Sequence, residues 1–165
     1  MMKNELEILT NILGKDAHII SPLVGGMMNK SFIVKNNKKK YVLYISTTQA
    51  NEMVNRELEK DNQEKVYSLS LTSKNVYFDT RKGIKINEYI EGDSLDKVCE
   101  YDLNKVQNLL KTLHNSNNRC QNDYLPFERL ENYRQEAISF HELSKEFKEL
   151  ENCLMLYKEW LLSQP

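Results

Sequence analysis

Strand-like segments occur only between residues 18 and 90 of this 165-residue chain, and every apolar pattern from residue 101 onward has helical spacing. Short runs that are rich in β-branched and aromatic residues and are separated by turn residues are typical of antiparallel strands. These runs cover residues 18–24, 31–35, 40–45, 75–79 and 83–90. Because the strands are collected in one part of the chain and helices follow, the sequence predicts an α+β fold with a five-stranded antiparallel sheet.

Apolar residues at helical spacing predict five helices. They are expected at residues 3–13, 51–71, 101–116, 127–142 and 144–163. The second of these is predicted to be one long helix that crosses the sheet. The change of pattern near Gly92 divides the chain into an N-terminal lobe of residues 1–91 and a helical part of residues 92–165.

The charge of the chain excludes several classes of partner. With 23 basic and 24 acidic residues, it has no global field that would attract nucleic acid or an anionic membrane. No run approaches the ~20 apolar residues of a membrane helix, and no export signal is visible at the N-terminus. Cys99, Cys120 and Cys153 form no Cys-x-x-Cys pair and are expected to be reduced. We therefore expect a cytoplasmic protein without a metal site that binds neither nucleic acid nor a membrane.

Gly25 and Gly26 lie between two short apolar runs, where the tip of a hairpin is expected. Glycine tolerates positive φ and carries no Cβ, so its N–H groups can turn toward an anion. A nucleotide-binding loop is therefore the first hypothesis for this segment. A plain tight turn is the alternative.

Five segments in a fixed order support the hypothesis of a nucleotide-binding loop. A Gly-Gly-x-x-Asn loop at 25–29 precedes the run 41–45, an Asn-Arg-x-x-Glu-x-x-Asn pattern at 55–62, the run 83–92 and a Leu-x-x-Leu-His pattern that ends at His114. Together they resemble bacterial choline kinases of the aminoglycoside phosphotransferase-like superfamily over nearly the whole chain. The resemblance implies a protein kinase-like small lobe, with a five-stranded sheet and one long helix, followed by the first helices of the large lobe.

The resemblance also implies an ATP site made of a phosphate-covering loop, a helical glutamate and a linker between lobes. The residues that match these three parts are Gly25, Gly26, Met27, Met28, Asn29, Glu59, Glu88, Tyr89 and Ile90. In the family the loop covers the phosphates, and the glutamate orients a basic residue on the third strand. The backbone of the linker hydrogen-bonds adenine.

Two positions of this site depart from the family. Tyr44 stands where the third strand carries Arg or Lys, and a phenol with a reference pKa of about 10 is neutral at pH 7. Lys40 shares its face of the strand but lies roughly 13 Å away along it. Met28 stands where relatives often have Ser or Thr. Weakened ATP binding is therefore expected.

The family's catalytic loop, H-x-D-x-x-x-x-N, has no counterpart in the sequence. Its Asp accepts the substrate hydroxyl proton and its Asn holds Mg²⁺, so no catalytic residue and no magnesium ligand is assigned here. The family's choline pocket is built mostly from the same part, and only Tyr124, Phe127 and Tyr133 are placed to contribute rings to it. The expected function is that of a truncated choline kinase-like phosphotransferase, inactive by itself, whose family makes phosphocholine from choline and MgATP.

Two alternatives to that function stay open. One is half of a split kinase that acts on choline or a related amino alcohol and is completed by a separate C-terminal half. The other is a non-catalytic module that binds a nucleotide or a protein. Self-association is expected in each case, because a missing lobe would leave apolar surface bare.

Overall fold

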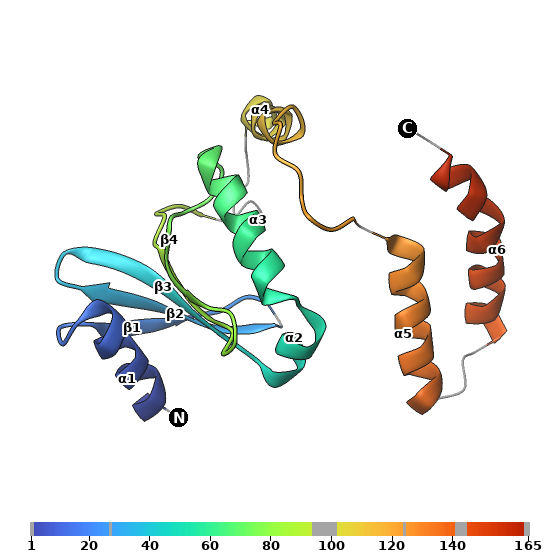
Figure 1. The fold of residues 1–165 in the computed structure, drawn as a ribbon. Coiled ribbons are helices and arrows are strands. Elements are labelled where there is room, and N and C mark those ends of the chain that lie inside the picture. The colour runs from blue at the N-terminus through green and yellow to red at the C-terminus, as the bar shows by residue number, and fades with distance from the viewer. Residues whose placement is uncertain (1, 27, 94–101, 124, 141–144, 164–165) are drawn as a thin grey trace. The chain divides into compact units, whose positions relative to one another are not determined.

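The computed structural model describes residues 2–26, 28–93, 102–123, 125–140 and 145–163 (Figure 1). The chain forms two compact units, residues 1–121 and 122–165, and each unit is described by itself. The predicted lobe boundary after residue 91 stays a prediction. Among the described residues, no helix is both long and apolar enough to span a bilayer.

A five-stranded antiparallel sheet forms the centre of the first unit (Figure 1). Its strands are β1 (His18–Leu23), β2 (Asn29–Asn36), β3 (Lys39–Ser46), β4 (Asn75–Asp79) and β5 (Ile84–Glu88). Their order across the sheet is β1-β2-β3-β5-β4. The predicted α+β class and all five predicted strands are confirmed.

The register is regular inside the sheet and irregular at both edges. The pairs β2–β3 and β3–β5 run without a shift. The edge pair β1–β2 shifts between Ile19 and Ser21, and the edge pair β4–β5 shifts between Asn75 and Tyr77. The three inner strands therefore form a regular platform for the site.

Helix α1 (Met2–Leu13) covers one face of the sheet. Its Leu9 is fully buried together with Val34, Leu43 and Ile86 from three strands. Burial of one such side chain contributes about 1.5–3 kcal/mol to folding. Because α1 occupies this face, the opposite face of the sheet remains for the site.

The single long helix predicted over residues 51–71 is two helices, α2 (Thr48–Met53) and α3 (Arg56–Ser68). Val54 between them is extended, and the side chain of Asn55 accepts hydrogen bonds from the N–H groups of Glu57 and Leu58 at 3.1 and 3.2 Å. A side-chain oxygen that satisfies the first N–H groups begins a new helix at that point. The apolar spacing on both sides of Asn55 concealed this break.

Three further helices follow the sheet. Helix α4 (Leu103–His114) belongs to the first unit, and the Asp102 side chain caps its start. Helices α5 (Pro126–Phe140) and α6 (Lys145–Leu162) form the second unit, where they lie antiparallel (Figure 1). The Nε of Arg134 on α5 lies 2.8 Å from Oε1 of Glu151 on α6, and this ion pair joins the two helices.

Candidate nucleotide site

A cavity of about 680 Å³ lies on the sheet face opposite α1. It is lined by Leu23, Val24, Gly25, Ser31, Val42, Tyr44, Leu71, Thr72, Ser73, Glu88, Tyr89, Ile90, Gly92 and Asp93. These residues come from the end of β1, the glycine loop, β2 and β3, the segment between α3 and β4, and the end of β5 with the residues that follow it. The volume suits a ligand of nucleotide size.

Of the nine residues predicted to bind nucleotide, Gly25, Glu88, Tyr89 and Ile90 line this cavity. Met28, Asn29 and Glu59 belong to the loop end, to β2 and to α3, and are not among its lining residues. The same holds for Gly26. Met27 lies outside the described residues.

The glycine loop has the backbone freedom that the sequence predicts. Gly25 and Gly26 have φ angles of 143° and 80°, and a Cβ atom at either position would meet no atom within 4 Å. The far end of the loop is anchored, because the backbone N–H of Thr47 donates to the carbonyl oxygen of Met28 at 3.1 Å. The loop is thus open above the cavity and tied down beside α2.

The segment after β5 is held by backbone hydrogen bonds from both sides. The N–H of Glu88 donates to the Lys74 carbonyl at 2.9 Å, and the N–H of Tyr89 donates to the Lys40 carbonyl at 3.1 Å. The ammonium of Lys40 also lies 5.3 Å from the centre of the Tyr89 ring. These contacts fix the position of Ile90, whose side chain is 66% exposed at the rim of the cavity.

One row of directly paired residues crosses the sheet beneath the cavity. It runs through Leu23, Ser31, Tyr44, Lys85 and Phe78, each opposite the next on the neighbouring strand. Directly opposed residues of an antiparallel sheet present their side chains on the same face. The first three of these residues line the cavity, and Lys85 is the next residue in the row.

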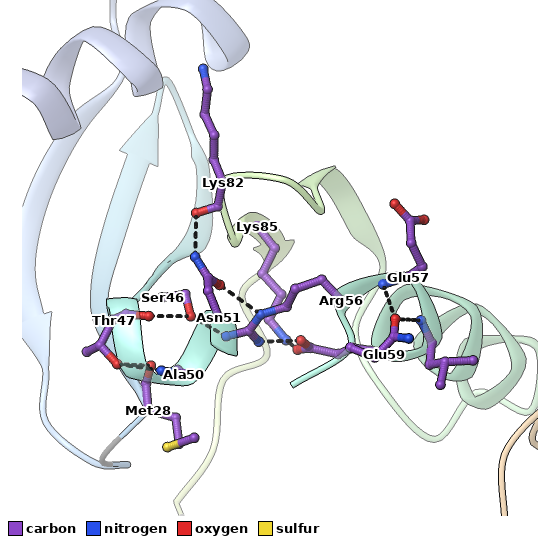
Figure 2. Close-up of polar contacts among 12 residues, drawn as sticks. Met28, Ser46, Thr47, Ala50, Asn51, Arg56, Glu57, Glu59, Lys82 and Lys85 are labelled. Atoms are coloured by element: carbon purple, nitrogen blue, oxygen red, sulfur yellow. Dashed lines mark hydrogen bonds and ion pairs between the residues drawn. The ribbon is translucent and has the colours of Figure 1, made fainter. Parts of the chain in front are cut away.

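A charged cluster lies where this row meets α3 (Figure 2). Glu59 of α3 forms two ion pairs. Its Oε1 lies 2.5 Å from Nζ of Lys85, and its Oε2 pairs with the guanidinium of Arg56. Lys85 and Glu59 are only 17% and 23% exposed, and Arg56 is buried. Two cations therefore share one carboxylate in a partly desolvated position, where charge interactions are stronger than in water.

Arg56 connects this cluster to the glycine loop. Its guanidinium donates to Asn51 Oδ1 at 3.1 Å and to the hydroxyl of Ser46, the last residue of β3 (Figure 2). The adjacent Thr47 holds the Met28 carbonyl. A continuous chain of polar contacts thus leads from the loop to Glu59.

The pKa values of the two titratable groups, Glu59 and Tyr44, are shifted in opposite directions. Burial raises the pKa of Glu59, but the hydrogen bonds and positive charges of Lys85 and Arg56 outweigh it, so the pKa of that carboxyl is lowered. Burial raises the pKa of the Tyr44 phenol. At pH 7 Glu59 is therefore an anion, and Tyr44 is neutral, as the sequence predicts.

The predicted choline-pocket rings already lie close to cations of this chain. Lys158 Nζ lies 5.4 Å from the Phe127 ring centre, and the Arg129 guanidinium lies 5.4 Å from that of Tyr133. Tyr124 lies outside the described residues. In the described part of the chain, no group of three or more His, Cys, Asp or Glu side chains is placed to hold a metal ion.

Lys85 was not among the residues predicted to bind nucleotide, and neither were the cavity-lining residues Ser31, Leu71, Thr72, Ser73 and Asp93. The resemblance predicts a cation on β3, where this chain has Tyr44, whereas the structure places Lys85 directly opposite Tyr44 on β5. The signal was the strand-like run 83–90, in which Lys85 is the polar residue between two buried isoleucines, Ile84 and Ile86. Finding it required the pairing of β3 with β5, which is not local in sequence.

Comparison with known proteins identifies similar folds among solved structures. No protein-family model and no curated protein sequence matches this chain. The structure of choline kinase LicA from Streptococcus pneumoniae superimposes with a TM-score of 0.76 at 26% identity, over 98% of this chain and 57% of LicA. LicA in complex with AMP superimposes with a TM-score of 0.73 at 27% identity, over 97% of this chain and 56% of that chain.

A more distant structure has the same fold. A choline/ethanolamine kinase family protein from Mesorhizobium loti has a TM-score of 0.66 at 16% identity, over 100% of this chain and 55% of that chain. The resemblance to choline kinases is thereby confirmed, and the kinase-like fold with it. The chain spans a little over half of the length of these relatives, consistent with an N-terminal half.

Proposed function

We propose that this chain binds ATP as the nucleotide-binding half of a choline kinase-like phosphotransferase. The observation that carries the proposal is the 680 Å³ cavity between the glycine loop and the segment after β5. It is supported by the likeness to LicA, which has been solved in complex with AMP. Because ATP is available in the cytoplasm, we propose that the protein is cytoplasmic.

The adenine is proposed to lie against the segment after β5. The N–H groups of Glu88 and Tyr89 already donate within the chain, so we assign adenine to the Glu88 carbonyl and the Ile90 N–H. The side chains of Val42 and Ile90 would form apolar walls on the two sides of the base. Backbone groups held in this way can read the polar edge of a base without a dedicated side chain.

The phosphates are proposed to extend toward the glycine loop. Gly25 and Gly26 leave the backbone bare above the cavity, and Met28 precedes Asn29, the first residue of β2. Backbone N–H groups of such a loop are suited to an anion. The loop thus accounts for the phosphate side of the ligand, as the segment after β5 does for the base.

Phosphate transfer is proposed to need groups that these 165 residues do not contain. Phosphoryl transfer depends on positioning, on metal ions that neutralise the phosphates and on a group that accepts the hydroxyl proton. The sequence has no H-x-D-x-x-x-x-N motif, and the described residues include no group of three or more His, Cys, Asp or Glu side chains placed to hold a metal ion. We therefore propose that the chain binds nucleotide but does not phosphorylate choline when it is alone.

A thermal-shift titration with MgATP tests the binding proposal, because a ligand of the folded state raises the melting temperature. We expect a saturable shift that is lost in Gly26→Val, which places a β-branched residue at φ 80°. Asn37→Val is the matched control, because it places the same residue at φ 53° in another hairpin. A cooperative melt without any shift up to millimolar MgATP would refute nucleotide binding.

A kinase completed by a second polypeptide is the other function that an observation favours. Leu109, Leu110 and Leu113 of α4 are 55%, 50% and 40% exposed. Exposed apolar side chains that are grouped on one helix are typical of a surface that binds another polypeptide. We propose that they are covered either by polypeptide equivalent to the rest of LicA or by self-association. Phosphocholine formation from choline and MgATP, with and without that part of LicA added, tests the first case, and sedimentation tests the second.

A further inference from the structure

We propose that Lys85 supplies the cation that holds the phosphates of the bound nucleotide, in place of a basic residue on β3. This inference rests on the proposed function. Lys85 lies on β5, so the cation would come from the neighbouring strand. Its position in the row beneath the cavity, its partners and the local balance of charge carry the inference.

The position of Lys85 is one strand away from the cavity wall. Tyr44 lines the cavity, and Lys85 is its direct partner on the next strand, with the ammonium 5.1 Å from the centre of the Tyr44 ring. Opposed residues of an antiparallel pair have Cβ atoms about 5 Å apart. A lysine side chain is long enough to cross that separation, so its ammonium can serve the position where Tyr44 presents only a neutral phenol.

The ammonium of Lys85 is held in one place by its surroundings. It lies between the rings of Tyr44 and Phe78, at 5.1 and 5.6 Å from their centres, and 2.5 Å from Oε1 of Glu59. Aromatic faces attract a cation, and the carboxylate fixes its direction. A cation that is already ordered loses little conformational entropy when it binds an anion.

The cluster of Arg56, Lys85 and Glu59 has a net positive charge when no anion is bound. Arg56 and Lys85 carry two positive charges against the single negative charge of Glu59. Arg56 is buried and its guanidinium also donates to Asn51 and Ser46, whereas the side chain of Lys85 is 17% exposed and belongs to the row of residues on the cavity side of the sheet. An ammonium has three donors, and Glu59 takes one of them. A phosphate group would balance the remaining positive charge.

Lys40 is a less suitable source of the cation. Its side chain is 45% exposed. Its Nζ lies 3.6 Å from Oε1 of Glu91 and 5.3 Å from the centre of the Tyr89 ring. These contacts hold it beside the segment after β5, where the base is proposed to bind. Lys85 is the lysine that pairs with α3 and neighbours Tyr44.

The test compares the binding of ATP and adenosine by calorimetry, because the two ligands share a base and a ribose but only ATP has phosphates. Loss of one charge-assisted contact is expected to weaken ATP binding about 10- to 100-fold in Lys85→Met. Adenosine binding is expected to stay within about twofold of wild type, since no phosphate is involved. Lys82→Met is the matched control, because it removes a 74% exposed lysine near the same strand and should leave both affinities unchanged.

A double variant moves the cation back to β3. Tyr44→Lys combined with Lys85→Tyr exchanges two directly opposed residues, and we expect it to recover at least tenfold of the ATP affinity that Lys85→Met loses. Equal ATP affinity of wild type and Lys85→Met would overturn the inference and leave nucleotide binding intact. Equal losses for ATP and adenosine would show that Lys85 only supports the fold. If the wild type bound neither ligand, both the proposed function and this inference would fail.

Discussion

Gly83 and Asn51 are in such close contact that a Cβ atom built on Gly83 would overlap Oδ1 of the Asn51 side chain. The same Cβ would lie 2.6 Å from Cβ of Ser46, and the φ of Gly83 is 64°, where a side chain is strained. Asn51 and Ser46 hold the guanidinium of Arg56 together with Glu59. The turn before β5 and the charged cluster therefore depend on each other.

Gly83→Ala is expected to destabilise the first unit by about 2–4 kcal/mol, because it combines backbone strain with steric overlap. Urea unfolding followed by far-UV circular dichroism measures the change. Tryptophan fluorescence is unsuitable, since the single tryptophan, Trp160, belongs to the other unit. Gly92→Ala is the control, because a Cβ there meets nothing within 4 Å. Equal stability of the two variants would contradict the overlap.

Asn55→Ala is expected to cost about 1 kcal/mol, because it removes the side-chain oxygen that receives the N–H groups of Glu57 and Leu58 at the start of α3. Asn55→Asp keeps an acceptor and should retain most of the stability. Amide hydrogen exchange of residues 56–60 locates the effect. Unchanged exchange in the alanine variant would mean that α3 begins without the cap.

Glu59→Gln is expected to lower the stability of the protein near neutral pH and to matter progressively less in acid. The pKa of Glu59 is lowered in the folded state from 4.5 in the unfolded chain. A lowered carboxyl pKa stabilises the fold above the unfolded value, and this contribution disappears as pH falls through the folded value. The difference in melting temperature between wild type and variant should therefore shrink as pH falls below 4.5.

The control for this pH dependence is Glu64→Gln, which changes an exposed residue of the same helix. Its melting temperature should follow that of the wild type over the whole pH range. A gap between wild type and Glu59→Gln that stayed constant in acid would mean that the effect is steric and does not come from the ion pairs.

Asn75→Ala is expected to destabilise the edge of the sheet by about 1–3 kcal/mol. The Asn75 amide donates to Asn87 Oδ1 at 2.8 Å and to the Tyr77 carbonyl at 3.1 Å, and Asn87 is buried. Loss of the donor leaves a buried acceptor unsatisfied. Urea unfolding by circular dichroism measures the loss, and Val76→Ala, at a 42% exposed position of the same strand, is the control. Equal effects of both substitutions would remove any special role for the amide.

The sheet and the glycine loop could be predicted from the sequence because their signals are local. Alternating apolar residues and turn residues mark each strand, and the Gly25-Gly26 pair marks the loop. The break at Val54 was missed because helical spacing continues on both sides of it and only the Asn55 cap reveals it. Lys85 was missed because its partners Tyr44 and Glu59 are distant in sequence, and strand pairing with helix packing brings the three together.

The irregular pairing of both outer strands bears on how the protein behaves at high concentration. A flat sheet edge offers unpaired N–H and carbonyl groups to another chain, and a bulge twists the edge out of register with such a template. β1 has its shift next to Pro22, which donates no backbone hydrogen bond, and β4 has its shift at Asn75. Amyloid-like growth by strand addition is thus disfavoured at both edges of the sheet. Any assembly of this protein is therefore expected to use contacts between side chains.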